Sequence, residues 1–181
     1  MQYEQTITTP KGLVVHIRNG AASDGSTVLE NFNLTHAETD YLLSYPDENH
    51  FDAEQESRYL EKKATSPNEI ELIAFVDDKV VGTAGIDAIG PQYKVAHRAE
   101  FGINILKEYW GLGIGRALME ACIQCARTAG YVQLDLDVVA ENARAISMYR
   151  TAGFVEYGRN PKGFRSRNAG FQELISMRLE L

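Results

Sequence analysis

The sequence has no apolar run that approaches the ~18 residues needed for a membrane-spanning helix. Its first residues, Met1–Thr6, lack the basic and apolar regions of a secretory signal. We therefore expect a protein that has no membrane partner and stays in the cytoplasm. Basic residues are also few, because 18 Lys and Arg stand against 25 Asp and Glu, for a net charge of −7. This balance argues against nucleic acid as a partner and mildly favours cationic ligands such as amines.

Cysteine and histidine are too sparse for a metal centre. The two cysteines, Cys122 and Cys125, fall on the apolar stripe of one expected helix, and no second pair completes a metal site. The four histidines are scattered without ligand spacing, at His16, His36, His50 and His97. The spacing of the cysteines would also suit redox chemistry, but we predict buried, inert thiols and no bound metal.

The remaining composition is typical of one globular domain spanning residues 1–181. Hydrophobic residues make up 44% of the chain and charged residues 24%. These values argue against disorder, and a chain of this length can bury a single core. No repeat, low-complexity tract or linker divides the sequence. A homodimer is left open.

Periodicity and turn residues indicate a mixture of strands and helices. Alternating apolar residues predict strands, and the Asp77-Asp78 pair joins two of them as a hairpin. Apolar residues three to four apart predict helices, two of which end at Gly130 and Gly153. The expected strands are 13–18, 70–76, 79–86, 95–106, 133–139, 154–157 and 172–181. The expected helices are 27–32, 52–63, one that ends at 128 and 141–152, and residues 158–170 are expected to form a loop.

The segment Trp110–Arg116 is the most informative part of the sequence. Gly111, Gly113 and Gly115 alternate between an expected strand and an expected helix. Three alternating glycines exceed what a tight turn needs, and they leave backbone N–H groups uncovered at the positive end of a helix dipole. The segment therefore predicts a phosphate site. A nucleotide P-loop and a dinucleotide fingerprint both require a different spacing, so neither fits.

Two motifs resemble those of the GCN5-related N-acetyltransferases. The pyrophosphate loop of that family reads Arg or Gln, two residues, Gly, one residue, then Gly or Ala, and Gly113 and Gly115 stand at the two glycine positions. A later family motif (Asn, two residues, Ala, three residues, Tyr, three residues, Gly-Phe) matches Asn142–Phe154. The resemblance extends from residue 72 to the C-terminus. The sequence departs from the family at Trp110, where Arg or Gln is usual, and at Lys107, where Pro is common.

The resemblance implies both a fold and a coenzyme site. The fold would be α/β, a mixed and mostly antiparallel sheet of six to seven strands flanked by helices, with a parallel strand pair splayed apart at the coenzyme. Acetyl-CoA would place its pyrophosphate at the glycine loop, and its pantetheine arm would pair with the exposed edge of the preceding strand. The residues implied in coenzyme binding are Ile103, Asn104, Ile105, Trp110, Gly111, Leu112, Gly113, Ile114, Gly115, Arg116, Asn142, Ala145 and Tyr149.

Tyr149 lies two helical turns after Asn142, on nearly the same face of the expected helix. A tyrosine hydroxyl has a pKa near ~10 and a thiol near ~8.5, so a positioned tyrosine can share its proton with a departing thiolate. By resemblance, Tyr149 would be this general acid. The alternative is a tyrosine that packs over the core. Asn142 is either the N-cap of the helix or a pantetheine contact, or both.

Glu100 interrupts an otherwise apolar strand, where a buried and unpaired carboxylate would be costly. By resemblance to the phosphinothricin-type branch of the family, Glu100 would take the proton of the amine. A structural salt bridge with Arg98 or His97 is the alternative. A water relay without a dedicated base is a third interpretation.

Together these residues predict an enzyme that transfers the acetyl group of acetyl-CoA to a primary amine by direct attack in a ternary complex. Because Cys122 and Cys125 lie on the buried stripe of a helix, no covalent intermediate on cysteine is expected. The acceptor, a small-molecule amine or a protein N-terminus, is left open, and the helices around Asp52 and the loop near Lys162 would select it. The alternative function is a non-catalytic acyl-CoA-binding or sensing module.

Overall fold

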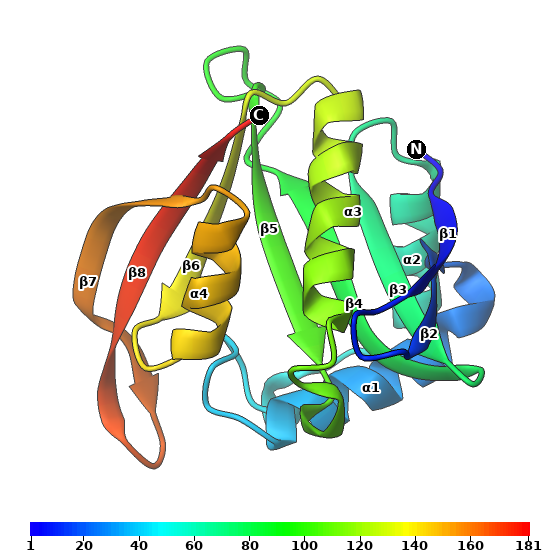
Figure 1. The fold of residues 1–181 in the computed structure, drawn as a ribbon, viewed down its shortest axis with the longest axis horizontal. Helices are drawn as coiled ribbons and strands as arrows, with labels where there is room; N and C mark the ends of the chain where they lie inside the picture. The colour runs from blue at the N-terminus through cyan, green and yellow to red at the C-terminus, as the bar shows by residue number, and fades with distance from the viewer.

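The computed structural model describes residues 1–181, which form one mixed sheet with helices on both faces (Figure 1). Its helices are α1 (Gly25–Ala37), α2 (Ala53–Thr65), α3 (Ile114–Thr128) and α4 (Ala143–Thr151), with 3-10 turns at Ala22–Asp24, Pro46–Glu48 and Lys107–Tyr109. Its strands are β1 (Glu4–Thr8), β2 (Val14–Asn19), β3 (Ile70–Val76), β4 (Lys79–Ala88), β5 (Arg98–Ile105), β6 (Gln133–Val139), β7 (Val155–Ser166) and β8 (Gly170–Glu180).

The strand order is β1-β2-β3-β4-β5-β6-β8-β7, and only β5 and β6 run parallel. The predicted mixed, mostly antiparallel sheet is therefore confirmed. It has eight strands, one more than the upper end of the predicted range, because β1 was not foreseen. The residues of β1 are mostly exposed and carry no apolar alternation, so pairing with β2, and not its own sequence pattern, makes this segment a strand.

The predicted loop over residues 158–170 is wrong. β7 continues to Ser166, and only the short turn before Gly170 separates it from β8. The register shifts between Glu156 and Gly158, and again between Asn160 and Phe164. These irregularities accommodate Asn, Gly and Pro residues that favour turns, and the cross-strand pairing overrides their local preference. The strand expected over 95–106 begins at Arg98, and the helix expected over 27–32 extends over all of α1.

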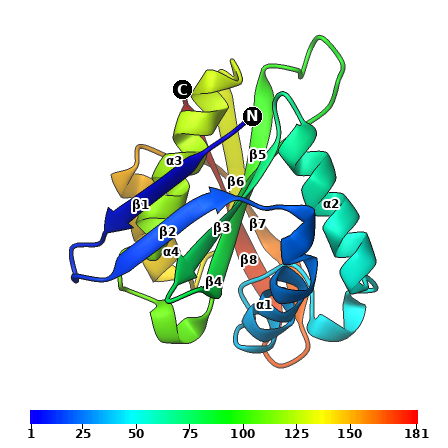
Figure 2. The same cartoon turned by 90° about the vertical axis from the view of Figure 1, so that its right-hand side faces the viewer.

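The helices divide between the two faces of the sheet. Figure 2 shows α3 on one side and α1 and α2 on the other. α3 buries an apolar stripe that includes Leu118 and Cys122 against the central strands, and both residues belong to the main hydrophobic core. Both cysteines are free and buried, and burial raises the pKa of their thiols, to about 11 for Cys125. The predicted burial of both thiols is therefore confirmed. No helix combines the length and apolar character that crossing a membrane requires.

The centre of the sheet opens between β5 and β6. The two strands pair over only three residues each, from Arg98–Gln133 to Glu100–Asp135. Beyond this point the strands diverge (Figure 1), while β6 continues its pairing with β8. The predicted splayed parallel pair is therefore present.

Candidate active site

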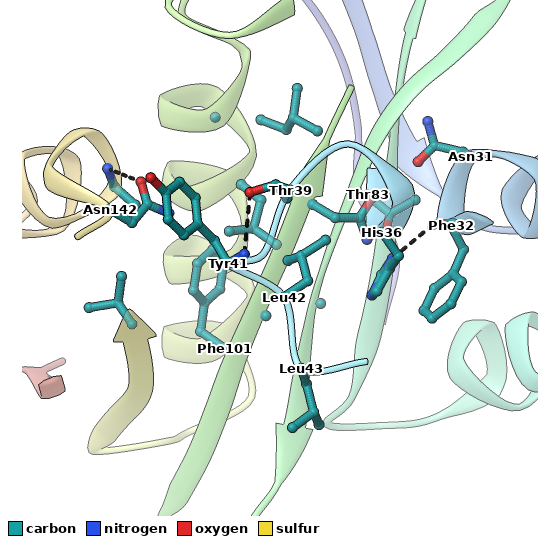
Figure 3. Close-up of a pocket in the computed structure, with 18 of the residues that line it drawn as sticks. Asn31, Phe32, His36, Thr39, Tyr41, Leu42, Leu43, Thr83, Phe101 and Asn142 are labelled. Atoms are coloured by element: carbon teal, nitrogen blue, oxygen red, sulfur yellow. Dashed lines mark hydrogen bonds between the residues drawn. The ribbon is translucent and has the colours of Figure 1, made fainter. Parts of the chain in front are cut away.

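A cavity of about 960 Å³ occupies the opening in the sheet. Its walls come from α1, the segment after α1, α2, strands β3 to β7, the glycine corner and α4. Figure 3 shows Asn142 on one side of the cavity, Asn31 and His36 of α1 on the other, and the Thr39–Leu43 segment between them. A cavity of this size holds an extended small molecule. Of the residues that the sequence placed at the site, all but Leu112 and Ile114 line it, and Ile114 is buried in the core.

The open edge of β5 is formed by two residues that the sequence selected. Leu106 donates its N–H to Val81 of β4 at 2.9 Å, which fixes the alternation of hydrogen-bonded pairs along these antiparallel strands. By that alternation Asn104 also directs its backbone groups to β4. Ile103 and Ile105 therefore direct theirs toward the opening, as a strand-like ligand would require.

The glycine corner leaves its backbone donors free at the start of α3. The first intrahelical bond runs from Ala117 to Gly113, so the N–H groups of Ile114, Gly115 and Arg116 have no partner within the helix. These donors sit at the positive end of the α3 dipole, which is the arrangement predicted for an anion. Leu112 lies between the two turn-forming glycines.

The glycines are needed for reasons other than anion access. Gly111 and Gly113 have φ angles of 76° and 96°, in the left-handed region that favours glycine. A Cβ at Gly113 would also lie 3.1 Å from the Cβ of Thr9. A Cβ at Gly115 would lie 3.1 Å from Ile105 and 3.2 Å from the sulfur of Met148, so this glycine permits close packing of α3 on β5 and α4.

Trp110 and an arginine that the sequence did not select complete the corner. The indole of Trp110 donates to the carbonyl of Ile105 at 2.8 Å, so this carbonyl is not available to a ligand. The guanidinium of Arg144 lies 5.5 Å from the Trp110 ring and lines the cavity. Arg116, in contrast, pairs with Glu120 at 2.8 Å on the surface of α3. The position of Arg144 within the second motif was the signal available for it.

Asn142 caps α4, because its side chain accepts a hydrogen bond from the N–H of Ala145 at 3.2 Å. The N-cap interpretation is therefore confirmed. Tyr149 is buried between Phe101 and Phe154, with ring centroids 6.2 Å and 5.8 Å away, and it also lines the cavity. Burial raises the pKa of Tyr149 well above the ordinary value, so the hydroxyl stays protonated at any working pH.

Glu100 is not held in a salt bridge. Arg98 pairs instead with Asp135 at 2.6 Å, and no ion pair joins Glu100 to His97. The salt-bridge alternative is therefore wrong. Glu100 is exposed to the cavity, and its pKa is raised by partial burial and by the nearby charges of Asp137 and other carboxylates.

Glu71 is a second cavity carboxylate, and sequence reasoning did not select it. It interrupts the apolar strand β3 in the same way that Glu100 interrupts β5, which was the available signal. Burial raises the pKa of Glu71 to about 7, although a hydrogen bond from Thr83 and the charge of Lys63 act in the opposite direction. Glu71 therefore changes its charge near neutral pH. No cluster of three or more potential metal ligands occurs in the structure.

The comparisons with known proteins match this geometry. A family model described as the acetyltransferase (GNAT) family matches residues 34–154, a range that contains the glycine corner and the whole second motif. The chain belongs to the GNAT family. This confirms the resemblance drawn from the two motifs and makes the protein a member of a family of N-acetyltransferases.

Particular GNAT relatives extend the comparison. The chain is 30% identical over 118 residues to the L-amino acid N-acetyltransferase AaaT of Escherichia coli K12, across 65% of this chain and 72% of that protein. A GNAT-family acetyltransferase structure from Streptococcus pneumoniae is similar with a TM-score of 0.88 and 29% identity, over 92% of this chain and 99% of that one. The fold is shared with yncA of Salmonella typhimurium, solved with its cofactor acetyl-CoA, at a TM-score of 0.81 and 19% identity, over 92% and 94% of the two chains.

Proposed function

We propose that this GNAT protein transfers the acetyl group of acetyl-CoA to a primary amine by direct attack in a ternary complex. The observation that carries the proposal is that two features share one cavity. One is the glycine corner together with the open edge of β5, and the other is the side of the sheet that bears carboxylates. Two substrates can therefore approach each other through the opening between β5 and β6. Acetyl-CoA supplies the activated acetyl thioester, and the chain has to hold it and handle two protons.

The residues present fit this coenzyme. Free N–H groups at the start of α3, together with the cation of Arg144, suit a pyrophosphate. The backbone of Ile103 and the N–H of Ile105 face the opening and suit the amide groups of a pantetheine arm, while Trp110 keeps the Ile105 carbonyl occupied. The acetyl-CoA in the structure of yncA, which has the same fold, supports this assignment.

Glu100 and Tyr149 are the groups proposed for the proton steps. Glu100 is unpaired and its pKa is raised, so it is better able to accept the proton of an ammonium group than an ordinary glutamate. The hydroxyl of Tyr149 has no partner in the chain and stays protonated, so it can donate a hydrogen bond to charge that develops on sulfur. Its raised pKa favours stabilisation of the thiolate over complete proton transfer.

The test combines binding with turnover. Calorimetric titration with acetyl-CoA should give saturable binding, and release of free thiol should depend on an added amine. Binding without thiol release from any amine of a broad panel would instead support an acyl-CoA-binding or sensing module. A cytoplasmic location and a homodimer, both considered from the sequence, remain part of the proposal. Light scattering of the purified protein measures whether it is a dimer.

A further inference from the structure

The two sides of the cavity carry opposite charge. On the α3 and α4 side, Arg144 lines it beside the glycine corner, and Arg116, which also lines it, is paired with Glu120. On the α1 and α2 side, and across the opening, carboxylates line it from five different elements, at Glu56, Glu71, Asp87, Glu100 and Asp137. This separation assigns the anionic coenzyme and a cationic acceptor to opposite sides of the sheet.

The sheet leaves open space between these carboxylates. Asp87 of β4 is directly opposite Glu100 of β5, and in the next row of the same face Gly85 is opposite Gly102. Glu71 of β3 is opposite Gly85. A Cβ at Gly102 would meet nothing within 4 Å, whereas one at Gly85 would collide with the carboxylate of Glu71. Gly102 therefore leaves open space above the sheet, the Glu71 carboxylate lies over Gly85 beside it, and the other acidic groups surround this space.

Two buried amide oxygens on the same side also need hydrogen-bond donors. Asn31 of α1 is 2% exposed, and its amide nitrogen donates to the carbonyl of Val80 at 3.2 Å, which leaves its side-chain oxygen without a partner. Asn104 donates to the hydroxyl of Thr83 at 3.1 Å, and its oxygen is likewise buried and unpartnered. Both asparagines line the cavity, as Figure 3 shows for Asn31. Orphaned acceptors of this kind call for a ligand that carries N–H groups.

This side has no cation left for an acidic ligand. The ammonium of Lys63 is bound to the Asp87 carboxylate and to the carbonyl of Ile86. Burial lowers the pKa of His36, so its imidazole is neutral at neutral pH, and its Nδ1 lies 2.8 Å from the carbonyl of Phe32. The carboxylate of an amino acid would therefore face like charges and acceptor oxygens.

We infer that the acetyl acceptor is an aliphatic diamine or polyamine without a carboxylate, one amine reacting at the opening while a second ammonium group is bound by Glu71, Glu56 and the orphaned asparagine oxygens. This inference rests on the function proposed above and specifies its substrate class. It also gives a role to Glu71, whose carboxyl is only partly ionised near pH 7 before the ligand binds. A bound ammonium group favours the ionised carboxylate, so binding should release a proton.

The first test compares three acceptors of equal length at saturating acetyl-CoA: hexamethylenediamine, hexylamine and aminocaproic acid. We expect kcat/KM to be about tenfold or more higher for the diamine than for hexylamine, because the second charge meets unpaired carboxylates, and lowest for the amino acid. Equal values for the diamine and hexylamine, or a preference for aminocaproic acid, would overturn the inference while leaving the acetyltransferase proposal intact. No thiol release with any amine would refute the acetyltransferase proposal itself.

Variants separate substrate recognition from general damage. The ratio of kcat/KM for the diamine to kcat/KM for hexylamine should fall toward one in Glu56→Gln and in Glu71→Gln. This ratio is the readout because a general loss of activity lowers both values equally and leaves it unchanged. Glu61→Gln, an exposed charge change on α2, is the matched control and should keep the wild-type ratio. Calorimetry of diamine binding to the protein loaded with coenzyme A, in buffers of different ionisation enthalpy, tests the inference without turnover. Binding of hexylamine as tight as that of the diamine, without proton release, would contradict it.

Discussion

Replacing Asp135 by asparagine should destabilise the fold at the point where the sheet opens. The carboxylate of Asp135 is 8% exposed and lies 2.6 Å from both Arg98 of β5 and Arg178 of β8. It accepts two hydrogen bonds from each guanidinium, and it belongs to the last parallel pair, opposite Glu100. Asparagine keeps the shape of the side chain but leaves two cations without a negative charge and places an NH₂ donor against donors.

The expected loss of unfolding free energy is ~3 kcal/mol, near the lower end for breaking a buried ion pair. The lower end applies because the two arginine side chains are 29% and 27% exposed and keep part of their hydration. For a chain of 181 residues this corresponds to a fall of roughly 6–12 °C in melting temperature. Urea unfolding at neutral pH measures the free energy, and Glu141→Gln, an exposed change of equal charge without an ion pair, is the control.

The same substitution should flatten the acid dependence of stability. Burial raises the pKa of Asp135, but hydrogen bonds and charges from Arg178 and Arg98 outweigh it, so the net shift is downward. A lowered folded-state pKa stabilises the fold above the unfolded value, and this stabilisation disappears as pH falls through the folded value. The wild type should therefore lose stability more steeply than Asp135→Asn as pH falls from ~5. A variant within ~0.5 kcal/mol of the wild type, or with the same pH slope, would refute the reasoning.

Three further substitutions test the coenzyme side of the cavity. Tyr149→Phe should lower amine-dependent thiol release by roughly ten- to a thousandfold with coenzyme affinity nearly unchanged, and wild-type turnover would reduce Tyr149 to a packing residue. Arg144→Gln should weaken acetyl-CoA binding about three- to tenfold in calorimetry, and the effect should be smaller at high salt. The control is Arg127→Gln, at the other end of α3, which should leave the affinity unchanged. If Arg144→Gln also leaves the affinity unchanged, Arg144 does not contribute to coenzyme binding. Gly113→Ala should cost more unfolding free energy than Gly130→Ala, by ~1 kcal/mol, because both glycines have positive φ but only the Cβ at position 113 meets Thr9. Equal losses would mean that backbone strain alone selects the glycine.

The parts of the site that the sequence predicted are those that a few neighbouring residues determine. Positive φ at Gly111 and Gly113 and the start of a helix directly afterwards depend on the local chain, so the donors of the corner could be placed in advance. The cap of α4 is equally local, because Asn142 and Ala145 are three residues apart. The edge of β5 was reached only through the family resemblance, since a single strand pattern does not say which neighbour is missing.

The parts that the sequence did not predict depend on contacts between distant segments. β1 and the second half of β7 are strands because a partner lies beside them, and neither has the apolar alternation that marks a strand in isolation. Arg144 reaches Trp110 only because α4 packs beside the corner, which places a cation near the position where the family usually has Arg or Gln. Glu100 was selected because a single carboxylate interrupts an apolar strand, and the same reasoning applies to Glu71. Only the fold shows that both residues face one cavity.

β5 explains how one strand can serve two substrates. Its odd residues face the α3 and α4 side, where Phe101 contacts Tyr149 and Ile105 lies beside Gly115. Its even residues face the α1 and α2 side, where Glu100 lies opposite Asp87 of β4. The backbone groups of the odd residues point along the sheet into the opening, between these two faces. A ligand that pairs with this edge therefore reaches the acidic side only through the gap between β5 and β6. The gap begins just beyond the Glu100–Asp135 pair, where Asp135 binds Arg98 and Arg178, so the ion-pair cluster that stabilises the fold lies at the point where the two strands separate.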